Sequence, residues 1–204
     1  MINKINPQKE FEKNLSIAIS NACFTVRLPD DMVEEYNNKS YEWAEDKKTF
    51  GHHYTLDQKN IHARSNNGHS AQGALEYQLG VKFTEWMIGN KKLFNTPDLR
   101  PIGLEIGVKA FKAPKNAPII FKQSHYPEIL MCRDQYDKSL YYCLGLFGPS
   151  TLNFKDYTCD SLIIDPDLLE RGTKTGFYKV DVGKPFTCLE DLKKLAGTKW
   201  ITKK

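Results

Sequence analysis

The sequence has no long apolar run, no paired cysteines and no glycine- or proline-rich linker, and each absence excludes a class of protein. No apolar run reaches the roughly 18 to 20 residues that cross a bilayer, and the opening MINKINPQKEFEKN lacks the apolar segment of a secretion signal. The five cysteines are scattered and form no CxxC pair, which is typical of reduced thiols rather than of a disulfide framework. We therefore expect a soluble, cytoplasmic protein with no membrane partner.

Local signatures of several chemistries are missing as well. The chain has no GxGxxG or GKS/T loop, and it shows no local Ser-His-Asp or Cys-His pattern of nucleophilic catalysis. His52, His53, His62 and His69 lie close together, but no HxxxH, HExxH or cysteine pair accompanies them, so zinc is not favoured. A net charge of +4 is compatible with binding to the phosphate backbone of a nucleic acid but does not by itself indicate such binding.

The length and composition fit one domain. The chain has 204 residues, of which 40% are hydrophobic and 26% charged, enough to bury a sizeable core. No repeat or change of composition marks a boundary. We predict a single domain over 1–204, with a helical N-terminal region (1–60) and a core (61–197).

Apolar residues at helical spacing, together with start and stop signals, predict helices, and one polar stretch predicts a loop. The helices are 11–20, 29–48, 69–80 and 188–197, and the loop is 51–68. In helix 69–80, Ser70 is a candidate N-cap and Gly80 ends the helix. Gln72 and Glu76 share one face of it, because they are four residues apart.

Short runs rich in β-branched and aromatic residues, separated by turn-forming clusters, predict a sheet in the second half of the chain. These runs are 102–111, 117–121, 128–134, 140–148, 160–165 and 177–182. The run 24–29, FTVRLP, fits either a short strand or an extended link. Helices first and last with strands between them indicate the α+β class.

Charged residues interrupt one of the most apolar stretches, PDLRPIGLEIGVKAF (97–111). If a strand runs from 102 to 111, its period of two places Glu105 and Lys109 on the same face. The two side chains then lie about 13 Å apart along the strand, at ~3.3 Å per residue. The lysine amine would reach the carboxylate only by folding its long side chain back.

A turn before this strand brings a second carboxylate into range. Pro101 and Gly103 are turn formers, so the chain can double back and set Asp98 opposite Glu105 on neighbouring strands. Two carboxylates so placed can share Mg²⁺, with water and a substrate phosphate as its other ligands. Glu76 is a candidate third acid on the flanking helix.

Each of these residues also has a purely structural interpretation. Asp98 can satisfy the loop in which it lies, and Glu105 can face water from an edge strand. Lys109 can form an exposed pair with Glu105 that contributes well under ~1 kcal/mol. Glu76 can be an ordinary surface residue of its helix.

The order of these features resembles the PD-(D/E)xK nuclease superfamily, the restriction-endonuclease-like fold, in which a carboxylate-bearing helix precedes a PD dipeptide and a strand with an acid and a lysine. The likeness is to an uncharacterised phage-type branch, covers roughly residues 60–195 and depends on short motifs. It implies a central mixed sheet flanked by helices, DNA as partner, and hydrolysis by metal-activated water with Mg²⁺ or Mn²⁺. A phage-encoded protein would act in the host cytoplasm.

The resemblance also implies roles for single residues. Asp98 and Glu105 become metal ligands, and Glu76 and Lys109 complete the catalytic set. The lysine departs from the pattern, because Gly107 stands where the superfamily has a basic residue and Lys109 lies two positions further on. The alternative is therefore a nuclease-fold module without catalysis that binds nucleic acid or protein. A third interpretation, favoured by the modest charge, is a structural or host-interaction protein.

A second set of residues, near helix 69–80, is a candidate for contacts with DNA. It comprises Lys59, His62, Arg64 and Gln72. The oligomeric state stays open, with a homodimer as one option.

Overall fold

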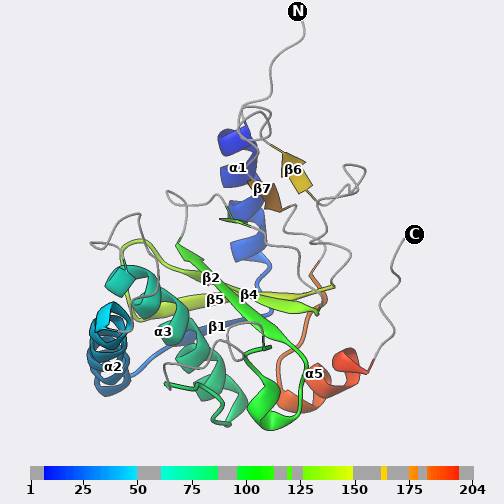
Figure 1. Ribbon diagram of the computed structural model, residues 1–204. Coiled ribbons are helices and arrows are strands. Elements are labelled where there is room, and N and C mark those ends of the chain that lie inside the picture. The colour runs from blue at the N-terminus through cyan, green and yellow to red at the C-terminus, as the bar shows by residue number, and fades with distance from the viewer. Residues whose placement is uncertain are drawn as a thin grey trace, which may run out of the picture.

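The computed structural model describes residues 7–49, 61–86, 96–112, 119–120, 126–148, 162–164, 175–178 and 183–197. In chain order its elements are α1 (Pro7–Ser20), β1 (Phe24–Arg27), α2 (Asp30–Thr49), α3 (Ile61–Leu79), the 3-10 helix η3 (Arg100–Ile102), β2 (Gly107–Lys112), β3 (Ile119–Ile120), β4 (Glu128–Arg133), β5 (Leu140–Phe147), β6 (Leu162–Ile164), β7 (Thr175–Tyr178) and α5 (Leu189–Ala196). The predicted α+β class is confirmed, with a four-stranded mixed sheet flanked by helices (Figure 1).

The four-stranded sheet has the order β1-β5-β4-β2, which leaves β2 at one edge. β5 is antiparallel to both of its neighbours, whereas β2 runs parallel to β4. A second sheet of three strands has the order β3-β7-β6. Because β1 pairs with β5, the N-terminal region contributes a strand to the same sheet as the core.

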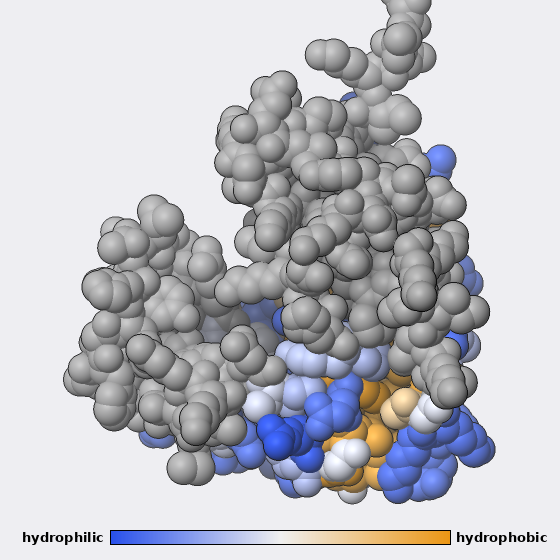
Figure 2. Space-filling model, turned by 45° about the vertical axis from the view of Figure 1, so that its right-hand side comes forward, coloured by the Kyte–Doolittle hydropathy of each residue, from blue (hydrophilic) through white to orange (hydrophobic). Residues whose placement is uncertain are grey.

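The two faces of the four-stranded sheet carry different elements. α2 and α3 lie on one side, and α1, β6 and β7 lie on the other (Figure 1). On the α3 side, Ile129 and Met131 of β4 pack in one buried cluster with Ala71, Ala74 and Leu75 of α3. Residues of a strand alternate between its two faces, so the neighbours of Ile129 and Met131 along β4 face away from α3. An apolar strip is visible at the lower end of the molecule, between hydrophilic surfaces (Figure 2).

Elements with strong local signals follow the sequence predictions. α2 begins with acidic residues at Asp30, Gly80 follows α3 with a φ of 65°, and Gly197 follows α5. β4 and β5 lie within the predicted runs, and FTVRLP contains a strand, β1. Three predicted runs are described only in part: 117–121, 160–165 and 177–182. Among the described helices, none combines the length and apolar character that a bilayer crossing requires.

The predicted loop 51–68 is wrong in its second part, because α3 already begins at Ile61. The first part of that loop lies outside the described residues. Ser70 is therefore not an N-cap; it is buried in the middle of α3. The polar side chains of the first turns bind neighbours, as when Asn66 donates to the side-chain oxygen of Asn37 on α2 over 3.4 Å. Such tertiary contacts, which the local pattern does not contain, allow a polar stretch to be helical.

The predicted strand 102–111 begins only at Gly107, so its first half is wrong. η3 and a left-handed glycine, Gly103 at a φ of 80°, come before the strand. The Leu99 amide donates to the Ile106 carbonyl oxygen over 2.9 Å and closes the turn. The chain doubles back as predicted, but through a compact turn instead of a two-stranded hairpin.

Two cysteines meet where β1 pairs with β5. The Cys23 amide donates to the Cys143 carbonyl oxygen over 2.9 Å, and the two thiols are hydrogen-bonded to each other. The bond from the Cys143 thiol is the main reason that the pKa of Cys23 falls to about 6, although burial opposes it. Burial raises the pKa of Cys143 well above its usual value.

We expect Cys23 to react with iodoacetamide as a thiolate, with a rate that is half-maximal at a pH of about 6. Cys143 is fully buried and should react only after unfolding. Mass spectrometry of alkylated peptides over a pH series measures both rates, with Cys23→Ser as the control. A half-maximal rate near the ordinary thiol pKa of 9.0 would contradict this prediction.

Candidate active site

Asp98 binds a backbone amide on the edge of β2 that faces away from β4. The Gly107 amide donates to the Pro127 carbonyl oxygen over 3.0 Å, on the side of β4. Amides of a parallel strand alternate in direction, so the next amide, that of Val108, points away from β4. It donates to Asp98 Oδ2 over 2.6 Å. The turn closed by Leu99 is what brings Asp98 back to this edge.

A second element, α3, holds the other oxygen of Asp98. Gln72 Nε2 donates to Asp98 Oδ1 over 2.7 Å. Burial raises the pKa of Asp98, although the Val108 amide and the charge of Lys109 favour the ionised carboxylate. The carboxylate is thus oriented from two sides by residues far apart in the sequence.

Gly107 is the point on which the neighbouring side chains converge. A Cβ atom at this position would lie 3.0 Å from the Tyr126 ring, 3.3 Å from Glu128 Cγ and 3.5 Å from Asp98 Oδ2. Gly107 is the register partner of Glu128 in the parallel pair of β2 and β4. The absence of a Cβ atom therefore lets two acids and an aromatic ring share one small space.

Lys109 supplies the positive charge of this group. Its Nζ lies 3.2 Å from Glu128 Oε1, and the lysine side chain is 43% exposed whereas that of Glu128 is 3% exposed. Burial lowers the pKa of Lys109, but Glu128 and Asp98 outweigh burial and leave the pKa above its usual value. Lys109 is therefore a cation at neutral pH.

Tyr126 adds a phenol to the same group. Burial raises the pKa of Tyr126, Lys109 lowers it, and the charges of Asp98, Glu128 and Glu105 raise it again, with a net increase. The phenol is therefore protonated at neutral pH and can donate a hydrogen bond. We call the five residues that meet here the edge-strand site: Gln72, Asp98, Lys109, Tyr126 and Glu128.

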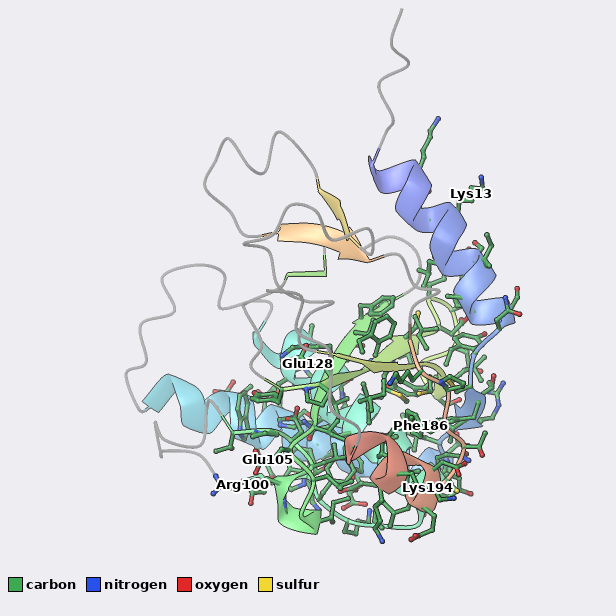
Figure 3. All side chains as sticks on the ribbon, turned by 90° about the vertical axis from the view of Figure 1, so that its right-hand side faces the viewer. Lys13, Arg100, Glu105, Glu128, Phe186 and Lys194 are labelled. Atoms are coloured by element: carbon green, nitrogen blue, oxygen red, sulfur yellow. The ribbon has the colours of Figure 1, made fainter. Side chains whose placement is uncertain are left out.

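Glu105 does not join the edge-strand site through any described hydrogen bond or ion pair. It lies in the turn before β2 and is exposed, so the strand period that paired it with Lys109 does not apply to it. In Figure 3, Glu128 lies at the level of the sheet, and Glu105 lies lower, towards the turn that carries Arg100. A role of Glu105 as metal ligand stays a prediction.

Glu76 is buried, but its oxygens are bound elsewhere. The amides of Phe83 and Thr84 donate to Oε1 over 2.5 and 2.6 Å. Oε2 accepts the Tyr36 hydroxyl at 2.5 Å and lies 3.2 Å from Lys82 Nζ. Burial raises the pKa of Glu76, but these donors outweigh it and leave the pKa below its usual value. These contacts give Glu76 a structural role, in which it fastens α2 and the segment after α3 to α3.

Of the four candidate DNA-contacting residues, the structure describes the side chains of His62 and Gln72. Lys59 and the side chain of Arg64 lie outside the described residues. His62 Nε2 lies 3.4 Å from the Asn37 carbonyl oxygen, and the His62 ring contacts Tyr41 edge to face. Gln72 belongs to the edge-strand site, where it orients a carboxylate.

Sequence reasoning missed two residues of the site, Tyr126 and the acid Glu128. The local signal of Glu128 was weak, since an acid at the first position of a strand is common. The signal that would have found it is the parallel pairing of β2 with β4, which puts the start of the EILMCR strand beside Gly107. That pairing joins segments about 20 residues apart in the sequence and cannot be derived from local periodicity.

The edge-strand site contains two acids, and no group of three or more histidine, cysteine, aspartate or glutamate side chains suited to a metal ion occurs within the described ranges. Comparison of the chain with protein-family models, curated proteins and solved structures gives no match.

Proposed function

We propose that the chain is a Mg²⁺-dependent nuclease that hydrolyses DNA phosphodiester bonds at the edge-strand site, on a sheet and helices of restriction-endonuclease-like arrangement. The observation that supports this most is the convergence of Asp98, Glu128 and Lys109 around Gly107. Two carboxylates and a cation in one place suit metal-assisted hydrolysis of a phosphodiester. In this proposal Glu128 takes the role that the resemblance gives to Glu105.

The two carboxylates fit a hard divalent cation. Proteins commonly hold Mg²⁺ by one or two carboxylates, while water and substrate phosphate complete the shell. Asp98 accepts hydrogen bonds from Gln72 and from the Val108 amide, and a carboxylate has about four lone-pair sites in all. Asp98 and Glu128 would hold the ion, which when bound activates water and stabilises charge on the phosphate.

The remaining residues of the site position these groups. Gln72 and the Val108 amide orient Asp98, which keeps the carboxylate directed towards Gly107. Lys109, partly exposed beside buried Glu128, presents an ammonium group that can orient a phosphate oxygen. The Tyr126 phenol is a second donor for the same purpose.

The Lys109–Glu128 ion pair favours one alternative, a nuclease-fold module that binds nucleic acid or protein without cleaving it. A lysine that already neutralises the buried carboxylate can replace a metal ion in the structure. The two functions differ in their need for a divalent metal, so metal dependence distinguishes them.

The proposal is tested by incubating supercoiled and linear DNA with the protein and Mg²⁺, Mn²⁺ or EDTA. We expect cleavage only with metal. A second readout needs no activity: Mn²⁺ should raise the melting temperature of the wild type, since binding stabilises a fold by about 2.7 kcal/mol at a hundredfold excess over Kd. Asp98→Asn should lose this shift and Glu105→Gln should keep it. DNA binding with neither cleavage nor a metal-induced shift would support the module instead.

A further inference from the structure

Three cations gather at the ends of β2 and β4 opposite to the edge-strand site. Lys112 and Arg133 are the last residues of these parallel strands and are register partners. Their side chains therefore lie next to each other, on the face that α3 covers. Lys138 follows in the turn after β4, where its carbonyl oxygen accepts a 3.0 Å hydrogen bond from Arg133 Nε. We call Lys112, Arg133 and Lys138 the basic cluster.

Arg133 is the fixed centre of the basic cluster. It is 5% exposed, which is unusual for a charged side chain. Nη1 donates to Asn66 Oδ1 on α3 over 3.1 Å, and the guanidinium lies 5.8 Å from the centroid of the Tyr141 ring. None of these partners is a carboxylate, and none of these hydrogen bonds uses Nη2. The described residues thus hold the guanidinium in place through neutral groups.

The basic cluster has no counter-charge in the part of the chain that the structure describes. Burial lowers the pKa of Lys112, and the neighbouring charges of Arg133 and Lys138 lower it further. No aspartate or glutamate among the described residues forms an ion pair with any of the three cations. Within the described ranges, like charges are therefore brought together without a neutralising acid.

The acids nearest in sequence are occupied by other partners. Asp134 accepts two backbone amides of its own turn and the hydroxyl of Tyr142. Asp137 forms an ion pair with Arg27 on β1. Both carboxylates are used to hold the turn and β1, which leaves the basic cluster as an excess of positive charge.

We propose that the basic cluster binds the phosphate backbone of a nucleic acid strand. The buried guanidinium attracts a phosphate by its charge, and half-buried Lys112 and exposed Lys138 present ammonium donors beside it. A phosphate supplies the negative charge that the described fold does not, so binding relieves the repulsion among the three cations.

The position of the basic cluster extends the proposed function. Lys112 lies three residues beyond Lys109 on β2, and Arg133 lies five residues beyond Glu128 on β4. At ~3.3 Å per residue the two sites are about 10 to 17 Å apart along the strands, and the odd residue offsets place them on opposite faces of the sheet. A nucleic acid strand that reaches both sites would pass around the edge strand β2; that path rests on the proposed function, whereas binding to the basic cluster does not require cleavage.

Binding is measured by fluorescence anisotropy with labelled single-stranded and duplex DNA in EDTA, where no metal-dependent cleavage occurs. We compare the wild type, the double variant Lys112→Gln/Lys138→Glu, and the control Lys194→Glu, whose side chain on α5 is 78% exposed (Figure 3). Buried Arg133 is left unchanged to protect the fold, and circular dichroism checks each variant.

The double variant should bind at least about tenfold more weakly, and the slope of log K against log salt should fall by about two, one for each lost phosphate contact. Lys194→Glu should bind like the wild type. Unchanged binding by the double variant, an equal loss in the control, or competition by polyglutamate as strong as by DNA would overturn the proposal. Cleavage is measured in a separate assay with Mg²⁺. A wrong assignment of the basic cluster shows in the binding assay, whereas absence of nuclease activity shows only in the cleavage assay.

Discussion

Glu128→Gln and Asp98→Asn should each lower Mg²⁺-dependent DNA cleavage by at least about 10²-fold, because each removes one of two carboxylates available for the ion. Both changes keep the shape of the side chain. In Asp98→Asn, the new amide oxygen can still accept the Val108 amide, and its nitrogen can donate to Gln72 once the Gln72 amide turns over. The chain should therefore stay folded while activity is lost.

Glu105→Gln is the matched control for this prediction. Glu105 also carries a carboxylate and lies close in sequence, but it is exposed and outside β2. It forms no described hydrogen bond or ion pair with the edge-strand site, although its charge acts on Tyr126, so its cleavage rate should remain within about twofold of the wild type, as for other exposed substitutions. Rates are measured by plasmid nicking at saturating Mg²⁺, with thermal unfolding of each variant as a folding check. If Glu105→Gln abolished cleavage and Glu128→Gln did not, the assignment of Glu128 would be wrong.

Glu76→Ala should lower the free energy of unfolding by about 3 to 5 kcal/mol, the typical loss when one partner of a buried charged network is removed. The change leaves the amides of Phe83 and Thr84 and the hydroxyl of Tyr36 without their acceptor. Glu76→Gln keeps an acceptor oxygen for the amides and should lose less. Urea denaturation gives these values, and an alanine variant as stable as the wild type would refute the structural role of Glu76.

The same network predicts a pH dependence. The pKa of Glu76 in the fold lies below its ordinary value of 4.5, so the unfolded chain takes up the proton first as pH falls. The stability that Glu76 contributes is complete above that ordinary value and decreases as pH falls through the lower pKa of the folded state. The difference in stability between the wild type and Glu76→Gln should therefore narrow below pH 4.5.

Local pattern was sufficient for some elements. The α5 helix has good helix formers and a following Gly197, β4 has an apolar centre, and β5 is a run of apolar and aromatic residues. Local pattern was insufficient where contacts with other elements determine the structure. The start of α3 is polar in sequence, yet its side chains bind α2, and the stretch before β2 reads as strand although Gly103 turns the chain there.

Some residues of the candidate site could likewise be predicted from local sequence, and others could not. Asp98 and Lys109 were found from one segment, because the turn and the strand that carry them are adjacent in sequence. Glu128 comes from β4, and only the parallel register with β2 places it beside Gly107. Glu76 was an acid on the correct helix, but the residue that reaches Asp98 is Gln72, one turn earlier. Which face of α3 meets the edge of β2 depends on packing across the whole sheet.

The central claim is that Asp98 and Glu128 hold one divalent cation, and a crystal soaked in Mn²⁺ tests it most directly. Anomalous difference density should show one ion within about 2.0 to 2.6 Å of carboxylate oxygens from both residues, with Lys109 displaced from its contact with Glu128. The same soak of a Glu128→Gln crystal should show no ion there. An ion bound to Glu105 and Asp98, or no ion near Gly107 at saturating Mn²⁺, would contradict the account.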